Sequence, residues 1–385
     1  MAGLVLANPS RNNEQTDNGS WGEIEQLLES IFLNYLDLFL PNSLHEYRKP
    51  SEKWFHIRKV SMGVFLKHYN ESMLAYNEQI IDRLNHLFGK FNDVIHKKIN
   101  LNIEEILEII EWIQTTENII VLDLEDLVHT FGKDAMNRFS SLFVCKLYDK
   151  YDYRLITDVN PAGLAPIINI NDKQAICLSV RQLYVAALKH FENIVKISPK
   201  AQSFFRHRGT WVEDKTAEII NRYFRKAKMY RNIYESPDSQ NEHDIIVLLN
   251  DRVFIIEVKT SPPKPPPIDP VKAFNRIRSA FSRSDTGIQK AYDQGLNLKH
   301  LIENNKQVDL YDKNGNILVT IDENDYKQGI NIICITLDDF GSLATDLSLL
   351  LKNRRRRNIL LSLTSMILKL FFGCLVKRKR MKLIS

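Results

Sequence analysis

Cysteine is scarce in this sequence and is never clustered. The four cysteines are Cys145, Cys177, Cys334 and Cys374. None belongs to a CxxC pair or lies beside a group of histidines, which argues against a disulfide framework and a structural zinc site. The amino terminus also lacks the basic segment and the long apolar core of a secretory signal. These absences predict a protein of the reducing cytoplasm.

Acidic residues are missing from the last part of the chain. Residues 352–385 contain 11 Lys and Arg and no Asp or Glu, which explains a net charge of +5 for the whole sequence. Residues 1–351 hold 41 basic and 47 acidic side chains. Any affinity of this main part for nucleic acid must therefore come from local patches of charge.

The amino-terminal half lacks a glycine-rich phosphate loop, an HExxH motif and a GxSxG motif. Residues 1–20 are polar, and we expect them to be disordered. Over 21–200, apolar residues recur at helical spacing in WGEIEQLLESIFLNYLDLFL, ESMLAYNEQIIDRLNHLFGKF, NIEEILEIIEWIQ and KQAICLSVRQLYVAALKHFENIV. We predict an all-α domain that regulates the rest of the chain, senses a target or forms a homo-oligomer.

The pattern changes to that of an α/β domain over 201–351. A helix from Val212 to about Lys228 precedes strand-like RNIYE and two apolar runs, IIVLL and RVFII. The proline-rich SPPKPPPIDP excludes regular structure between these runs and two further helices, at 271–283 and 286–302. A hairpin turning at Asn314-Gly315 and a buried strand, NIICITL, complete the predicted order.

The two apolar runs place acidic residues at matching positions. If Asn250 and Asp251 form the turn between them, opposed positions sum to 501, and Asp244 lies directly across from Glu257. Like charges in this arrangement destabilise a sheet. A divalent cation between them would explain the pair, because Mg²⁺ binds carboxylate oxygens.

Lys259 lies two residues past Glu257 and should project from the same face of the strand. The residues before Glu257 are apolar on both faces, which is typical of a central strand. The alternative is an exposed hairpin end at which Glu257 and Lys259 are solvated, and the two apolar faces argue against it.

Glu213 lies within the apolar stripe of the preceding helix, between the directions of Ile220 and Phe224 on a helical wheel. An acid on a packed face needs a partner, which a metal site or Lys259 would supply. A glutamate at the edge of the stripe that reaches water explains the pattern equally well.

Asp244, the Glu257–Lys259 segment thirteen residues later and Gly209-xxx-Glu213 at a helix start resemble the PD-(D/E)XK superfamily. These are restriction-endonuclease-like nucleases, and the resemblance covers about 205–340. It implies a restriction-endonuclease-like αβββαβ domain with a mixed central sheet, following the all-α domain.

The resemblance also implies roles for individual residues. Asp244, Glu257 and the carbonyl group of Val258 would bind the metal. Lys259 would orient or activate the attacking water, with assistance from Glu213.

One position of this motif departs from the pattern of the superfamily, and one accessory residue has two candidates. His243 stands where the name of the superfamily has proline, as in many of its members. Some members also have a glutamine on the following helix, for which Gln289 is the first candidate and Gln294 the second.

The expected function is hydrolysis of phosphodiester bonds, in DNA rather than RNA, by an endonuclease that uses Mg²⁺ or, in its place, Mn²⁺. A restriction or defence role fits a nuclease joined to a helical domain. The alternative is a catalytically silent nuclease-like module that binds nucleic acid or protein, and the intact Asp244, Glu257 and Lys259 argue against it. Burial would lower the pKa of Lys259 and the carboxylates would raise it, so the sequence leaves its protonation state open.

Basic residues suggest where nucleic acid would bind. Lys272, Arg276 and Arg283 point in similar directions on the helix at 271–283. Arg206 and Arg208 precede the helix that carries Glu213, and Arg222, Arg225, Lys226 and Lys228 extend this charge. Basic stripes beside a phosphodiester site suit backbone binding, and ordinary solvated helix faces are the alternative.

The tail, 352–385, contains an apolar run over 359–376 with basic residues at both ends. A run of about 18 residues is at the lower limit for a bilayer span. The alternatives for this run are a C-terminal membrane anchor, an interfacial helix on anionic lipid, a final core helix, or a truncated or frameshifted end.

Overall fold

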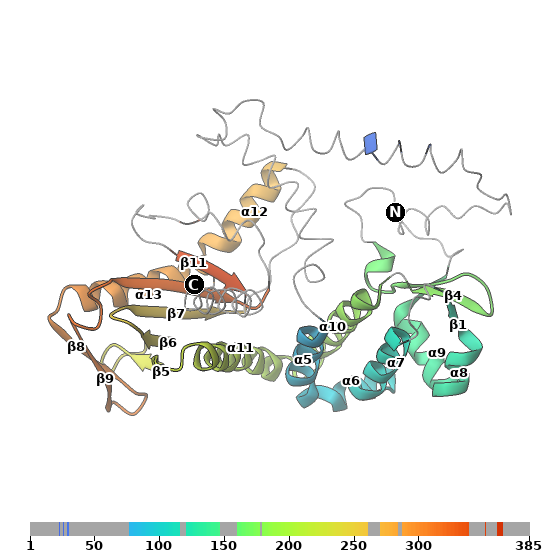
Figure 1. The fold of residues 1–385 in the computed structure, drawn as a ribbon, viewed down its shortest axis with the longest axis horizontal. Coiled ribbons are helices and arrows are strands. Elements are labelled where there is room, and N and C mark those ends of the chain that lie inside the picture. The colour runs from blue at the N-terminus through green and yellow to red at the C-terminus, as the bar shows by residue number, and fades with distance from the viewer. Residues whose placement is uncertain are drawn as a thin grey trace, which may run out of the picture. The chain divides into compact units, whose positions relative to one another are not determined.

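The computed structural model describes residues 23, 26, 29, 30, 77–115, 121–146, 160–177, 179–260, 270–283, 287–338, 351 and 360–364. These residues form two compact units (Figure 1). The first unit takes its described residues from 1–69, 92–194 and 265–276, and the second from 70–91, 195–264 and 277–385. The first predicted helix lies almost entirely outside the described residues.

The first unit combines helices with a small sheet. Its helices are α6 (Asn92–Ile99), α7 (Ile103–Thr115), α8 (Leu124–Phe131), α9 (Lys133–Phe143) and most of α10 (Val180–Lys196), with a 3₁₀ turn, η2 (Pro161–Gly163). Its strands are β1 (Val121–Asp123), β2 (Val144–Lys146), β3 (Ile167–Asn169) and β4 (Gln174–Cys177), in the order β1-β4-β3-β2.

The prediction of an all-α domain over 21–200 is therefore wrong for this unit. The sequence KQAICLSVRQLYVAALKHFENIV begins as strand β4 and becomes helical only at Val180. In β4, Ala175 and Cys177 are buried and pair with β3. A run of four residues is too short for its periodicity to distinguish a strand from a continuation of the adjacent helix.

The second unit is built on a seven-stranded sheet. Its helices are α5 (Asn77–Phe88), continued by the 3₁₀ turn η1 (Gly89–Phe91), α11 (Ala201–Tyr223), the end of α12 (Pro270–Ser282) and α13 (Ile288–Glu303). Its strands are β5 (Lys228–Tyr234), β6 (Glu242–Leu248), β7 (Val253–Lys259), β8 (Gln307–Tyr311), β9 (Ile317–Asp322), β10 (Ile330–Thr336) and β11 (Leu360–Thr364). The strand order is β11-β10-β7-β6-β5-β8-β9.

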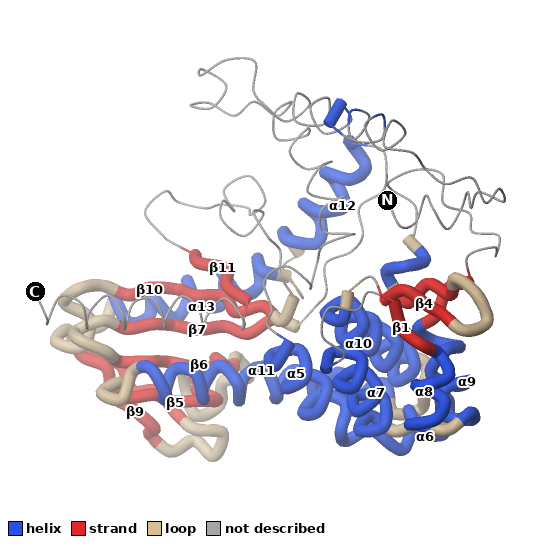
Figure 2. The backbone as a smooth tube through the Cα atoms, turned by 45° about the vertical axis from the view of Figure 1, so that its right-hand side comes forward, coloured by secondary structure: helices blue, strands red, loops and turns tan. Residues whose placement is uncertain are grey.

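This sheet is mixed. Strands β7, β10 and β11 are parallel to one another, and the pairings among β7, β6, β5, β8 and β9 are antiparallel. The order of elements, including the hairpin of β8 and β9, agrees with the predicted order. As expected, β7 is a central strand, between β10 and β6 (Figure 2).

Helices cover both faces of the sheet. On one face, Ile245, Val247 and Ile256 pack with Val212 and Ile220 of α11. On the other, residues of β6, β7 and β10 pack with α13 in a cluster made of Ile246, Leu248, Val253, Ile255, Leu298, Ile302 and Ile330. The alternation predicted for β7 is confirmed, because its even-numbered apolar residues face α11 and its odd-numbered ones face α13.

Helix α11 is longer at its start than the sequence predicted. It begins at Ala201 rather than Val212, so Gly209 lies inside the helix and not at its start. Phe204 is fully buried and stacks on Phe88, next to α5. Packing therefore offsets the helical cost of Gly209, about 1 kcal/mol relative to alanine. Helix α5, which the sequence grouped with the 21–200 domain, belongs to this second unit.

The described part of the tail is an edge strand. Leu360–Thr364, near the start of the apolar run, form β11 and pair in parallel with β10. The rest of the run lies outside the described residues. Among the helices that the structure describes, none has the length and apolarity needed to cross a bilayer.

Candidate active site

The hairpin of β6 and β7 has the predicted turn and register. Asn250 and Asp251 have φ of 50° and 57°, and the N–H groups of Leu249 and Arg252 each donate to the carbonyl group of the other. Asn and Asp tolerate this left-handed conformation, which is why they suit a two-residue hairpin turn. The ladder that follows pairs Ile245 with Ile256, in agreement with the predicted register.

The ladder stops one pair short of the two carboxylates. The Val258 N–H donates to Asp244 Oδ2 at 2.6 Å, so a side-chain oxygen takes this main-chain donor. Asp244 and Glu257 belong to the same end of the sheet, but they are not a ladder pair. The regular cross-strand opposition expected from the sequence is thus replaced by a local opening of the strands.

Glu257 is fully buried at the open end of β7. Its Oε1 atom accepts from Nδ1 of His243 at 2.8 Å, and its Oε2 atom lies 3.5 Å from Nζ of Lys259. The second distance is long for a charge-assisted hydrogen bond, which is typically about 2.7–2.9 Å. Oε2 therefore keeps capacity for another ligand.

Lys259 has a raised pKa. Burial lowers the pKa, but the negative charges of Glu257 and Asp244 raise it by more. Its ammonium group also lies 3.4 Å from Oε1 of Gln294 on α13. In the absence of a metal ion, these neighbours therefore favour the charged form of Lys259.

Asp244 also has a raised pKa, but for a carboxyl group this favours the neutral form. Burial and, next, the charge of Glu257 raise its pKa from 3.8 to about 7. Lys259 and the Val258 N–H lower it, but not by enough to compensate. Without a bound metal ion, ionisation of Asp244 beside Glu257 is therefore unfavourable near neutral pH.

Glu213 is half-buried on the side of α11 that faces the site. Burial raises its pKa, the charge of Arg231 lowers it, and smaller effects come from Glu242, Asp214 and Lys259. It also raises the pKa of Asp244. Of the two readings open to the sequence, the one in which Glu213 joins the electrostatics of the site fits this environment better.

The donor set suits a hard divalent cation. Oε2 of Glu257 has only the long contact with Lys259, and Oδ1 of Asp244 accepts no hydrogen bond from a described residue. Carboxylate and carbonyl oxygens are the ligands that Mg²⁺ prefers. No group of three or more His, Cys, Asp or Glu side chains in the described residues is arranged to hold a metal ion. The predicted set is smaller, with two carboxylates and one carbonyl group.

No protein-family model matches the chain, and no curated protein matches it.

Two residues of the site were not assigned a role by the sequence. His243 is 1% exposed and bonds both Glu257 and, at 3.1 Å from its Nε2 atom, Glu235. Burial lowers the pKa of His243, but its two acidic partners raise it to about 9. No sequence motif marks Glu235, which follows β5 directly.

The two glutamines of α13 lie in different surroundings. Gln294 contacts Lys259 through Oε1 and the carbonyl oxygen of Glu242 through Nε2. Gln289, the first candidate from the sequence, is buried and donates to Asp293. Contact with Lys259 thus favours Gln294.

The predicted nucleic-acid-binding residues differ in exposure. Arg206, Lys272, Arg276 and Arg283 are exposed. Arg208 is 6% exposed, and its guanidinium group lies over the rings of Phe204 and Phe205. This burial argues against a direct contact between Arg208 and a phosphate group.

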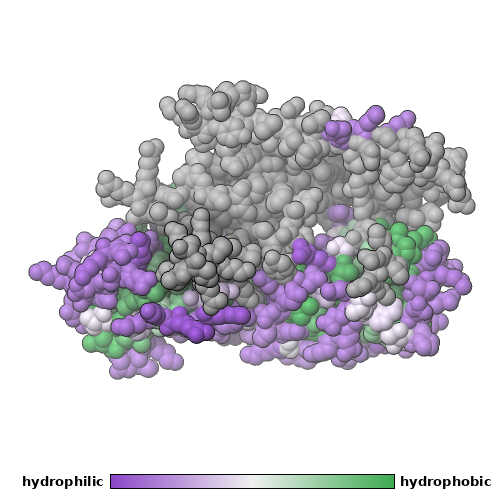
Figure 3. All heavy atoms as spheres, viewed as in Figure 1, coloured by the Kyte–Doolittle hydropathy of each residue, from purple (hydrophilic) through white to green (hydrophobic). Residues whose placement is uncertain are grey.

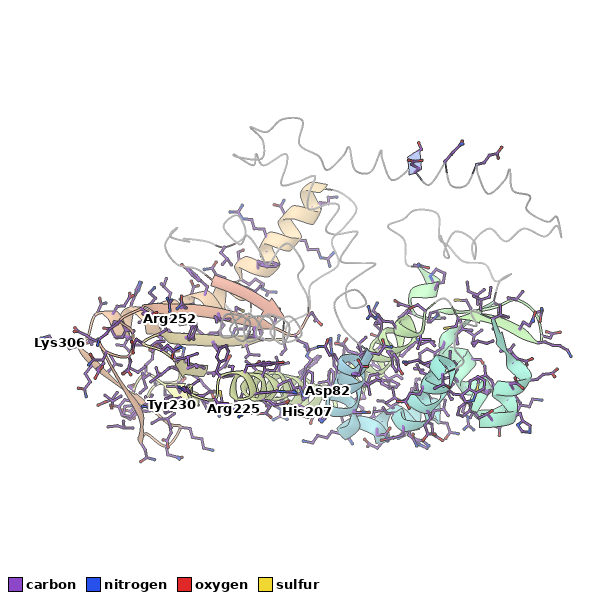
Figure 4. All side chains as sticks on the ribbon, in the orientation of Figure 1. Asp82, His207, Arg225, Tyr230, Arg252 and Lys306 are labelled. Carbon is purple, nitrogen blue, oxygen red and sulfur yellow. The ribbon has the colours of Figure 1, made fainter. Side chains whose placement is uncertain are left out.

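The basic residues at 222–228 lie away from the site. Lys228 pairs with Leu248 at the turn end of the hairpin, whereas the carboxylates are at the other end. The view in Figure 3 is hydrophilic along α11. Figure 4 shows His207, in the first part of this helix, well separated from Arg225, which follows its last residue, Tyr223.

Proposed function

We propose that the chain is a metal-dependent nuclease that hydrolyses phosphodiester bonds. The observation that carries this proposal is the convergence of Asp244, Glu257 and Lys259 at the open end of β6 and β7, with Glu213 beside them. A buried pair of carboxylates that raises the pKa of one member to about 7 is costly to keep. A divalent cation and a phosphate group would make this arrangement favourable.

The residues have distinct roles in the proposed reaction. Asp244, Glu257 and the carbonyl group of Val258 would hold Mg²⁺ or Mn²⁺. When bound, the ion supplies a Lewis acid and lowers the pKa of a bound water. The acidic neighbours of Lys259 raise its pKa in the metal-free site, and we assign it the stabilisation of negative charge on the phosphate oxygens rather than the acceptance of a proton.

Glu213 and Gln294 would assist from opposite faces of the sheet. Glu213 has a raised pKa and lies on the α11 side, where it can accept a hydrogen bond from the attacking water. Gln294 holds the Lys259 ammonium group from the α13 side. DNA as the substrate, endonucleolytic cleavage and a restriction or defence role come from the resemblance alone.

The proposal is tested by cleavage of plasmid and single-stranded DNA by the wild type and by Lys259→Ala, with Mg²⁺, with Mn²⁺ and with EDTA. Lys299→Ala is the matched control, because the Lys299 side chain is 15% exposed against 18% for Lys259 and bonds the start of β10. We expect cleavage by the wild type and by Lys299→Ala only when the metal is present. Lys259→Ala should lose about 10²–10³-fold in rate, as for other stabilisers of transition-state charge.

Equal cleavage by Lys259→Ala, or cleavage that survives EDTA, would show that the site is wrongly assigned. DNA binding without cleavage under every condition would favour the silent binding module.

A further inference from the structure

A buried chain of side chains leads away from Glu257 into the sheet. Nδ1 of His243 lies 2.8 Å from Oε1 of Glu257, and its Nε2 atom lies 3.1 Å from Oε1 of Glu235. The side chains of His243 and Glu257 are 1% and 0% exposed, and that of Glu235 is 24% exposed. Since both acceptors are carboxylates, the imidazole donates from both ring nitrogens.

A local irregularity of β5 and β6 makes this chain possible. The ladder pairs Arg231 with Ile245 and Ile233 with His243, and it omits Asn232 and Asp244, the two residues between. Asn232 has a φ of 51°, in the left-handed region. Such irregularities re-aim side chains next to functional sites.

The packing shows that the side chains of β5 change face at Asn232. Arg231 bonds Asp214 on α11, whereas Ile233, two residues later, packs in the cluster on the α13 face. In a regular strand these two side chains would share a face. His243 pairs with Ile233 and is thereby directed to the face that holds Glu257, instead of the face of Ile245.

We propose that His243 is a positioning residue for Glu257. It fixes Oε1, so that Oε2 is the oxygen presented to the metal and to Lys259, and Glu235 in turn holds the imidazole ring. This inference rests on the proposed function, because it treats Glu257 as a metal ligand. Partners of this kind typically affect metal affinity by about 10–100-fold.

Two substitutions separate positioning from simple packing. The amide nitrogen of Asn stands near the place of Nδ1 in His, and that of Gln near the place of Nε2. His243→Asn can therefore still donate to Glu257, and His243→Gln can donate only to Glu235. Both variants leave a polar amide in the same buried place, so a purely structural role would not order them by metal affinity.

Binding of Mn²⁺ to the full chain, measured by electron paramagnetic resonance without substrate, gives the decisive readout. We expect His243→Gln to weaken Mn²⁺ binding by about 10–100-fold and His243→Asn to recover most of that loss. In cleavage assays the half-saturating metal concentration should rise in His243→Gln, while kcat at saturating metal changes little. Thermal unfolding of each variant reports whether it is folded.

A milder variant covers the case in which His243→Gln does not fold. Glu235→Gln leaves His243 in place and removes one of its charged acceptors, and we expect weaker Mn²⁺ binding in the same direction. Equal Mn²⁺ affinity in the wild type, Glu235→Gln and every folded His243 variant would overturn the positioning role while leaving the nuclease proposal intact. A wild type that neither binds Mn²⁺ nor cleaves DNA would overturn the proposed function, and the positioning role with it.

Discussion

Burial and neighbouring charges shift the pKa values of single residues at the open end of β6 and β7. Lys259 stays charged because Glu257 and Asp244 surround it, and Asp244 is discouraged from ionising by burial and by Glu257. The sequence could place these residues together, because each is close to a strand of known register. It could not give their protonation states, which depend on the burial of each group and on His243.

The single substitution Asp244→Asn should stabilise the metal-free protein against unfolding. Because folding raises the pKa of Asp244 from 3.8 to about 7, the folded protein keeps a proton that the unfolded chain releases between these values. The free energy of unfolding of the wild type should therefore fall as the pH rises from about 4 to about 7. The neutral amide of Asn does not titrate, so the free energy of unfolding of the variant does not fall for this reason. Its oxygen can still accept a hydrogen bond from the Val258 N–H.

The measurement is urea unfolding in EDTA at several pH values. We expect Asp244→Asn to be more stable than the wild type by at least about 1 kcal/mol at pH 8, with a smaller gain at pH 5. The variant should also lose cleavage activity, as expected when a functional site is kept at the expense of stability. Asp238→Asn, at an exposed position, is the control. A gain that is the same at both pH values would contradict the assigned cause.

At the scale of the elements, the turn and register of the β6–β7 hairpin could be predicted from the sequence. The irregular pairing at its open end could not. Asn250-Asp251 is a short-range signal, and a two-residue turn fixes the register of both strands. The irregularity at Asn232, where φ is 51°, leaves no comparable signal, so the sequence offers no way to foresee that His243 contacts Glu257. Likewise, Gly209 suggested a helix boundary, whereas the packing of Phe204 extends α11 through it.

Helix α13 approaches β10 closely at Gly295, and this contact should limit substitution. A Cβ atom at Gly295 would lie 2.6 Å from Cγ2 of Ile332, a buried β-branched residue that cannot turn away easily. We expect Gly295→Ala to destabilise the protein by about 1–3 kcal/mol. The control is Gly209→Ala, also in a helix, where a Cβ atom meets nothing within 4 Å. It should stabilise by about 0.5–1 kcal/mol. The free energy of unfolding of both variants is measured in urea. A Gly295→Ala variant as stable as the wild type would contradict the close approach of α13 to β10.

For the whole molecule, the sequence located the change from helical to α/β pattern but not the membership of α5. Asp82 of α5 bonds Lys215 of α11, and Arg83 forms an ion pair with Asp338 after β10. These contacts join residues more than 100 positions apart, and local periodicity carries no information about them. The small sheet of the first unit was not predicted, because each of its strands has only three or four residues, too few to show a strand periodicity.

Net charge is the other property of the whole molecule that bears on function. Because acids outnumber bases over residues 1–351, binding of nucleic acid to this part should depend on where each basic residue lies. Arg206 is exposed and seven residues before Glu213, so it projects from nearly the same side of α11 about 10 Å away along the helix axis. Arg225 is also exposed, but it follows Tyr223, the last residue of α11, which lies about 26 Å from Arg206 along the helix axis.

We therefore expect Arg206→Gln, but not Arg225→Gln, to weaken binding of a short DNA duplex at the site. Each substitution removes one positive charge, so the comparison holds the net charge and the basic tail constant. Binding is measured by fluorescence anisotropy over a range of salt concentrations, in a Lys259→Ala background that slows cleavage and with EDTA present. Arg206→Gln should lower the slope of log K against log salt by about 1, as expected for one lost phosphate contact. Equal effects of the two substitutions would mean that total charge, rather than position on α11, determines the affinity.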